Sequence, residues 1–198
     1  ESYPIWAPDG KTLYYLRTEA DTAAILAFRP DSRDPARTVY SAPAIPDLQD
    51  VSPDGQTLAF TVQDTVSSTI RAVVMPLDGS QPPEPIDDSP GLTMRPRFSP
   101  DGRWLAYASR ESGRWEIYLK TFPLTGRKWQ LTDREAFWFE WHPDGDKVCF
   151  QWSGTELYAV DVDLAGATPR IGATRVLLDD FPTPVTSLHD FAITNDGQ

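Results

Sequence analysis

The stretch Phe98-Ser-Pro-Asp-Gly-Arg103 carries a Pro-Asp-Gly tripeptide that returns at regular intervals along the 198-residue chain. The other copies keep an apolar residue three positions before the aspartate: Trp6-Ala-Pro-Asp-Gly-Lys11, Val51-Ser-Pro-Asp-Gly-Gln56, Trp141-His-Pro-Asp-Gly-Asp146 and a degenerate copy with asparagine in place of proline, Ile193-Thr-Asn-Asp-Gly-Gln198. Successive aspartates of this motif are 45, 47, 43 and 52 residues apart. Regular recurrence with matching flanks indicates an internal structural repeat.

The chemistry of the motif predicts a tight turn between two strands. Proline presets the φ angle of the first central position, aspartate can accept a hydrogen bond from the backbone two residues on, and glycine tolerates a positive φ. We therefore expect each copy to form a hairpin turn. The predicted turn residues are Asp9, Gly10, Asp54, Gly55, Asp101, Gly102, Asp144, Gly145, Asp196 and Gly197.

The residues around each turn alternate in the manner of strands. After the third turn, for example, Leu105 and Tyr107 are separated by one residue and so share a face. Two further strands follow in each repeat, the last of them weaker. A period of ~40–45 residues is typical of a four-stranded propeller blade, so the sequence predicts an all-β chain: about four antiparallel blades plus the start of a fifth, as one partial β-propeller from a larger ring. The predicted blades span residues 1–46, 47–93, 94–137 and 138–184, and the next begins over 185–198.

Composition excludes several classes of protein. A hydrophobic content of 40% with 12% aromatic residues argues against global disorder, and 19 prolines and 12 glycines indicate many turns. The net charge of −11 opposes binding to nucleic acid and to anionic lipid surfaces. No apolar run approaches the ~20 residues of a membrane span. We expect a protein or a small ligand as the partner, no nucleic acid, and a chain that is not embedded in a membrane.

The sequence offers little for catalysis. It has no Gly-x-Ser-x-Gly motif, and its two histidines have simpler interpretations. His142 occupies the turn position that Ser52 and Ser99 fill in other repeats, and His189 precedes a predicted strand. We expect no catalytic residues and no cofactor, and any catalytic domain would lie outside this stretch.

Metal binding and thiol chemistry are not favoured either. The segment Asp161-Val-Asp163 resembles the start of a calcium loop, but Gly172 stands where that loop needs a glutamate. Cys149 aligns with Ala59 and Ala106 in second strands, which predicts a small buried residue rather than a reactive thiol. We therefore expect no metal site.

The charged residues of the predicted first strands are the best candidates for a binding site. Asp50, Arg97 and Glu140 each lie four residues before a turn aspartate, on the strand that lines the central channel of a propeller. They either pair with one another or with water, or they form the polar floor of a ligand site. Arg95 and Trp138, two residues earlier on their strands, would lie nearer the channel mouth, and arginine beside an aromatic residue is typical of recognition surfaces.

The repeats resemble the Pro-Asp-Gly class of WD40-like propellers, the TolB type, across essentially the whole chain. A more specific resemblance rests on the run Trp115-Glu-Ile-Tyr-Leu-Lys-Thr-Phe-Pro-Leu-Thr-Gly-Arg-Lys-Trp-Gln-Leu-Thr132, on Leu157-Tyr-Ala-Val160 and on the segment from Pro169 to Leu178. These are similar to blades fused to the carboxyl side of bacterial serine/threonine protein kinases.

The resemblance implies a non-catalytic sensor or protein-interaction module in the periplasm or elsewhere outside the cytoplasm. Two alternatives stay open. One is the gating propeller of a prolyl-oligopeptidase-like serine peptidase, and the other is a TolB-like component of a periplasmic envelope complex.

Overall fold

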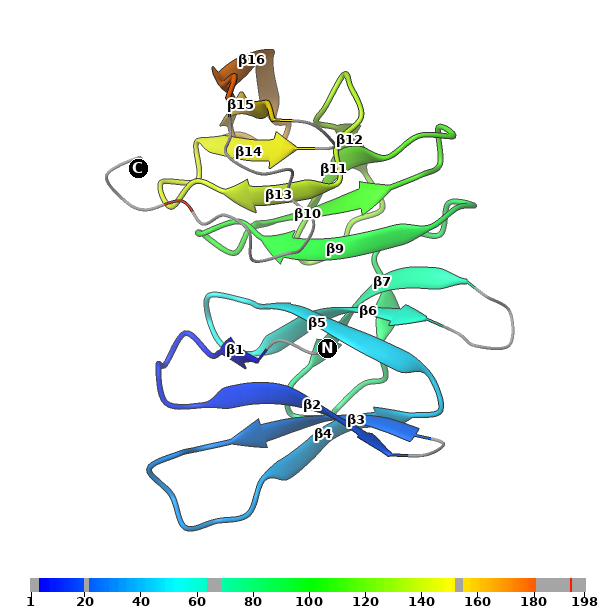
Figure 1. Ribbon diagram of the computed structural model, residues 1–198, viewed down its shortest axis with the longest axis vertical. Helices are drawn as coiled ribbons and strands as arrows, with labels where there is room; N and C mark the ends of the chain where they lie inside the picture. The colour runs from blue at the N-terminus through cyan, green and yellow to red at the C-terminus, as the bar shows by residue number, and fades with distance from the viewer. Residues whose placement is uncertain (1–3, 20–21, 64–68, 152–154, 181–192, 194–198) are drawn as a thin grey trace. The chain divides into compact units, whose positions relative to one another are not determined.

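The described residues of the computed structural model, 4–19, 22–63, 69–151, 155–180 and 193, contain sixteen β-strands and no helix (Figure 1). The strands form four antiparallel sheets of four, each sheet in chain order. The first two sheets contain β1 (Ile5–Trp6), β2 (Leu13–Glu19), β3 (Thr22–Phe28) and β4 (Arg37–Ala42), then β5 (Ile45–Val51), β6 (Thr57–Gln63), β7 (Ile70–Pro76) and β8 (Glu84–Pro85). The last two contain β9 (Thr93–Phe98), β10 (Trp104–Ser109), β11 (Glu116–Thr121) and β12 (Lys128–Gln130), then β13 (Trp138–Trp141), β14 (Lys147–Gln151), β15 (Leu157–Asp163) and β16 (Arg170–Leu178).

The chain divides into two compact units, residues 1–98 and 99–198. Apolar residues of the first two sheets form the core of the first unit, with Ile25, Leu58 and Phe60 fully buried. In the second unit the core joins strands of the last two sheets, and Leu119 and Phe150 are fully buried there. Each unit thus buries one face of a sheet against its neighbour, which a single blade cannot do for itself.

The Pro-Asp-Gly segments join the first strand of each sheet to the second. In each of the four turns the glycine N–H donates to the carbonyl three residues earlier, as in Gly102 to Ser99 at 2.8 Å. The four glycines adopt φ angles of 64°, 71°, 69° and 73°. That left-handed conformation favours glycine because it has no Cβ to clash.

Two features differ from a strictly regular repeat, in which the counterparts of Leu105 and Tyr107 would be buried in every sheet. In β2 the buried residue is Tyr14, whereas Leu13 and Tyr15 on the opposite face keep some exposure. The cause is that the core of the first unit lies on the face of β2 that carries Tyr14. The outer strand β16 has nine residues and is the longest of the described strands, although outer strands were expected to be weak.

The predicted start of a fifth blade, with Asp196 and Gly197 in its turn, lies outside the described residues except for Ile193.

Candidate functional site

Asp50 and Arg97, two of the residues predicted to line the channel, come together in the first unit. Asp50 lies on β5 and Arg97 on β9. The carboxylate of Asp50 accepts the backbone N–H of Val51 and that of Phe98, both at 2.8 Å. The Arg97 guanidinium donates to the backbone carbonyl of Gln49. These contacts join the innermost strands of two successive sheets.

The environment of Asp50 does not favour its charged form. Burial among protein atoms raises the pKa of Asp50 above its ordinary value, although the charge of Arg97 and the two amide donors act in the opposite direction. Asp50 therefore behaves as a structural acceptor between strands. Of the two alternatives left open by the sequence, this geometry favours pairing within the protein for Asp50 and Arg97.

Arg95 has an unusual backbone. It lies in β9 with a φ angle of 58°, and among the described residues it is the non-glycine residue with positive φ. Its side chain is buried, and its N–H donates to the Thr61 hydroxyl at 3.3 Å. A non-glycine residue in this conformation costs ~1–3 kcal/mol and persists where the surroundings impose it, often at functional positions.

In the second unit Trp138 lies within an aromatic cluster. Its ring meets that of Phe137 edge-on at 5.3 Å, and Phe137 meets Trp115 at 4.7 Å. All three side chains are partly exposed. Glu140 follows two residues later on β13, opposite Cys149 on β14. The aromatic cluster therefore lies where β13 begins, at the end of the sheet opposite its Pro-Asp-Gly turn.

Sequence reasoning identified Trp138 but missed Phe137 and Trp115. The adjacent Phe137 was a usable signal, because two consecutive aromatic residues at the start of a strand cannot share one face of the sheet. Trp115 could not be found in this way, since it lies on the loop between β10 and β11.

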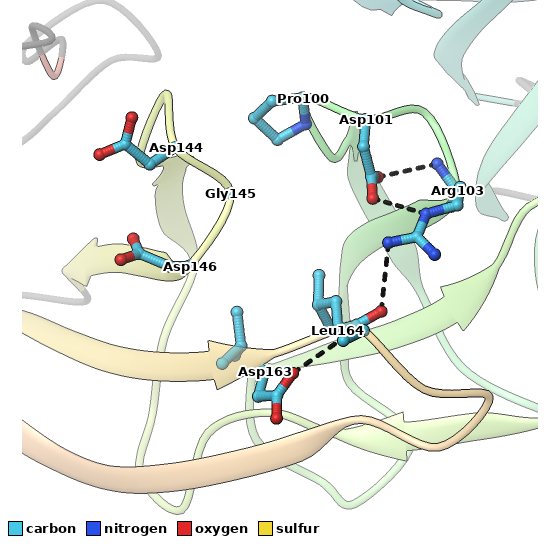
Figure 2. A pocket seen from close by; sticks show the side chains of 10 residues that line it. Pro100, Asp101, Arg103, Asp144, Gly145, Asp146, Asp163 and Leu164 are labelled. Atoms are coloured by element: carbon cyan, nitrogen blue, oxygen red, sulfur yellow. Dashed lines mark hydrogen bonds and ion pairs between the residues drawn. The ribbon is translucent and has the colours of Figure 1, made fainter.

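A second feature is a pocket of about 590 Å³ between two Pro-Asp-Gly turns of the second unit (Figure 2). One turn contributes Asp101 and Arg103, and the other contributes Asp144 and Asp146. The segment after β15 completes the lining with Asp163 and its neighbours. Figure 2 shows the Asp144 and Asp146 carboxylates on one side and Arg103 on the other. Four carboxylates against one guanidinium make this pocket more attractive to a cation than to an anion.

Arg103 is held firmly at the edge of the pocket. Its Nε donates to Asp101 Oδ2 at 2.7 Å, and its Nη2 reaches the Leu164 carbonyl at 3.3 Å. Partial burial disfavours the charged form of Asp101, but hydrogen bonds from Ser99 and Arg103 outweigh it and hold the pKa of Asp101 below its ordinary value. The turn aspartates were predicted only as structural residues. Their convergence on a pocket depends on how two repeats pack, which the sequence does not display.

The other side chains considered for chemistry have simple surroundings. Cys149 is buried, and burial raises the pKa of its thiol, which disfavours the nucleophilic thiolate. His142 lies in its turn, with Nδ1 at 3.6 Å from both Asp144 and Asp146. His189 lies outside the described residues. Within the described part of the chain, no three His, Cys, Asp or Glu side chains are arranged to hold a metal ion.

None of the described segments forms a helix with the length and apolar character needed to cross a bilayer.

Solved structures provide the comparison for this fold. No protein-family model matches the sequence, and no curated protein matches it. The chain is similar in structure to TolB from Acinetobacter baumannii, with a TM-score of 0.66 and 22% identity over 89% of this chain and 43% of that one. It is also similar to a putative TolB from Agrobacterium tumefaciens, with a TM-score of 0.63 and 19% identity over 91% of this chain and 81% of that one.

A peptidase shares the fold as well. Prolyl oligopeptidase B from Galerina marginata gives a TM-score of 0.64 and 14% identity over 98% of this chain and 28% of its own. The chain thus spans less than half of the Acinetobacter TolB and of this peptidase. These likenesses confirm the predicted fold: the chain consists of four-stranded β-propeller blades, similar in structure to those of TolB.

Proposed function

We propose that this chain is a non-catalytic binding module, and that it serves as an extracytoplasmic sensor or protein-interaction propeller of a bacterial protein kinase or regulator. The observation that carries the proposal is the partly exposed cluster of Trp115, Phe137 and Trp138 at the beginning of an innermost strand. Aromatic residues are enriched among the residues that dominate binding energy at protein interfaces. The likeness to TolB blades supports a propeller as the carrier of this cluster.

The geometry narrows the residues that would contact a partner. Asp50 and Arg97 already bond to backbone groups within the first unit, so their replacement would disturb folding as well as binding. Trp138 is the better test residue, because it is partly exposed and its ring contact is with another aromatic side chain. The proposed contact surface is therefore the aromatic cluster of Trp115, Phe137 and Trp138.

The test uses a photo-activatable amino acid at Trp138, with the same substitution at Trp6 as the control. Trp6 is 56% exposed, so both positions accept a reactive side chain. We expect light-dependent adducts with one defined partner at position 138 and none at position 6. The partner, identified by mass spectrometry and purified, should bind the wild-type protein at least about tenfold more tightly than Trp138→Ala, a loss of ~1.4 kcal/mol. Equal affinity for both proteins would refute the role of the cluster.

A second candidate is the gating propeller of a serine peptidase, favoured by the likeness to the Galerina prolyl oligopeptidase. A third, favoured by the two TolB structures, is a component of an envelope complex. The coding sequence on either side separates the three. A kinase domain and membrane helix upstream support the sensor, a Gly-x-Ser-x-Gly hydrolase downstream supports the peptidase, and a leader with a small separate domain supports the TolB-like component.

A further inference from the structure

One row of side chains in the first sheet breaks the pattern of the repeat. The register places Tyr14 on β2 opposite Ala27 on β3, and Ala27 opposite Arg37 on β4. Directly opposed residues of neighbouring strands lie on the same face of a sheet. The row therefore presents a large hydroxyl-bearing ring and a guanidinium on either side of a small methyl group.

The corresponding rows of the other sheets are filled differently. Counted from the turn aspartate, the position of Tyr14 is occupied by small residues elsewhere: Ala59, Ala106 and Cys149. Their partners on the third strands are Val74, Leu119 and Ala159. The outer position holds Glu84, Trp129 and Arg175 in these rows, and that arginine pairs with Asp161 at 3.0 Å. Only the first sheet combines a tyrosine and an arginine in this row.

The consequence of the small residue at the centre is a pocket of about 340 Å³. Tyr14, Ala27 and Arg37 line it, and the connection between β3 and β4 adds Arg29 and Asp34. That connection and the turn between β1 and β2 lie at the same end of the sheet (Figure 1). The volume lies at the lower end of the range for small-molecule sites, which run from ~300 to 1,000 Å³.

Most polar groups of the pocket are hydrogen-bond donors, and many of their O–H and N–H groups are not used within the protein. Tyr14 is only 6% exposed as a whole residue, and its hydroxyl makes no hydrogen bond with the described residues. The hydroxyl oxygen is not among the fully enclosed polar atoms that lack a partner, so it keeps contact with solvent. Burial raises the pKa of Tyr14, so the hydroxyl keeps its proton and can donate. Arg37 makes one long contact to the Leu77 carbonyl at 3.4 Å, and Arg29 lies 3.9 Å from Asp31. Each guanidinium has five N–H donors, so most remain available.

The local charge also differs from that of the protein as a whole. Two arginines and one aspartate line the pocket, Arg29, Arg37 and Asp34, whereas the whole chain has a net charge of −11. The acidic group that lines the pocket, Asp34, already accepts the Ser32 hydroxyl at 2.8 Å. Guanidinium groups match the planar, two-oxygen geometry of carboxylates and phosphates.

We propose that Tyr14, Arg29 and Arg37 form a binding site for a small oxyanion, with the two guanidinium groups pairing with its oxygens and the tyrosine hydroxyl donating to it. The ligand carries a carboxylate or a phosphate group. The site is independent of the aromatic cluster and of the function proposed above.

Titration calorimetry of the purified protein with succinate and, separately, with inorganic phosphate tests the site. Arg37→Gln removes one charged partner, and Tyr14→Phe removes only the hydroxyl while keeping the ring in the core. We expect Arg37→Gln to weaken binding at least about tenfold and Tyr14→Phe to weaken it about five- to tenfold, as for one lost hydrogen bond to an ion. Asp34→Asn should act in the opposite direction and tighten binding about two- to threefold, because it removes a like charge.

The matched control is Arg17→Gln. Arg17 lies on β2, the strand of Tyr14; it pairs with Glu19 at 3.2 Å and does not line the pocket. This variant should bind as the wild type does. The stronger of the two probes identifies the preferred oxyanion, and binding of either one with the expected ranking of variants supports the site. No binding of either probe at millimolar concentration, or binding that Arg37→Gln and Tyr14→Phe leave unchanged in folded protein, overturns the proposal.

Discussion

The third and fourth Pro-Asp-Gly turns have the same backbone but different side-chain bonding. In the third turn, the Ser99 hydroxyl donates to Asp101 Oδ1 at 2.6 Å and accepts the Trp104 N–H at 3.0 Å. The same Asp101 oxygen accepts the Arg103 N–H at 3.0 Å. One serine therefore connects the turn aspartate to the strand that leaves the turn.

The fourth turn has no such connection. His142 stands in the position of the serine, and its Nδ1 accepts the Asp144 N–H at 3.3 Å. The backbone bonds are kept, with His142 N–H to the Lys147 carbonyl at 2.9 Å and Gly145 N–H to the His142 carbonyl at 2.8 Å. The backbone and the glycine therefore define this turn, while the residue before the proline determines how many side-chain hydrogen bonds stabilise it.

The largest loss of stability should come from replacing the glycine that both turns share. Gly102→Val and Gly145→Val place a β-branched residue at φ angles of 69° and 73°. Such a residue is a strong outlier there, and the left-handed region alone costs ~1–2 kcal/mol. We expect each variant to lose at least ~2 kcal/mol in urea unfolding, with the steric cost of branching added to that of the backbone. An unchanged unfolding midpoint in either variant would contradict the turn geometry.

A smaller effect should separate the two turns. Ser99→Ala removes two hydrogen bonds and leaves the Trp104 N–H without its side-chain acceptor, so we expect a loss of ~1–2 kcal/mol. His142→Ala removes one long hydrogen bond, and we expect a loss of less than ~1 kcal/mol. Thermal unfolding of both variants in one buffer measures the difference. If His142→Ala cost as much as Ser99→Ala, the contrast between the turns would be wrong.

Replacing the histidine by serine should bring the fourth turn closer to the third. In His142→Ser the new hydroxyl can donate to Asp144 and accept the Lys147 N–H, as Ser99 does with its own partners. We expect a gain of ~0.5–1 kcal/mol in the free energy of unfolding, since a typical hydrogen bond contributes about that much. The reverse substitution, Ser99→His, is the matched control and should be destabilising.

The smallest effect is a pH dependence whose sign differs between two aspartates. The pKa of Asp101 is lowered, so its contribution to stability is present above its unfolded pKa of ~3.9 and is lost as the pH falls through the folded value. The pKa of Asp50 is raised, so its ionisation reduces stability as the pH rises through the folded value. The loss in free energy of unfolding that Asp101→Asn causes relative to the wild type should therefore be larger at pH 6 than at pH 3.

Asp50→Asn provides the internal comparison for this measurement. The wild type should gain stability relative to Asp50→Asn on acidification, which is the opposite trend to that of Asp101→Asn. Urea unfolding curves at several pH values between 3 and 7 give both trends. Parallel curves for the two variants would show that the two carboxylates share one environment and would contradict the structure.

Local chemistry explains what could be predicted from the sequence. The turns and the four-stranded sheets follow from a motif whose bonds lie within six residues, such as those between Ser99 and Trp104. The Asp50 bridge to the Phe98 N–H joins residues 48 positions apart. Neither segment has a sequence feature that identifies the other as its partner. For the same reason the cluster around Trp138 was only partly predicted.

The candidate sites show the same limit at the level of packing. The pocket between the third and fourth turns needs two repeats and the segment after β15 to meet. Tyr14 departs from the small residues of the other second strands, and that departure was visible in the sequence, but its meaning needed the register with Ala27 and Arg37. Register depends on cross-strand pairing, which a repeat motif alone does not determine.

The short span of the turn bonds has a consequence for the order of folding. Hairpins form within ~1–10 μs, whereas contacts across long loops must first overcome a larger entropy of closure. We therefore expect the Ser99 turn to be formed in the transition state and the Asp50 bridge to form afterwards. Folding and unfolding rates should give a φ-value for Ser99→Ala well above that for Asp50→Asn. The reverse ranking would mean that the innermost strands associate before the tight turns form.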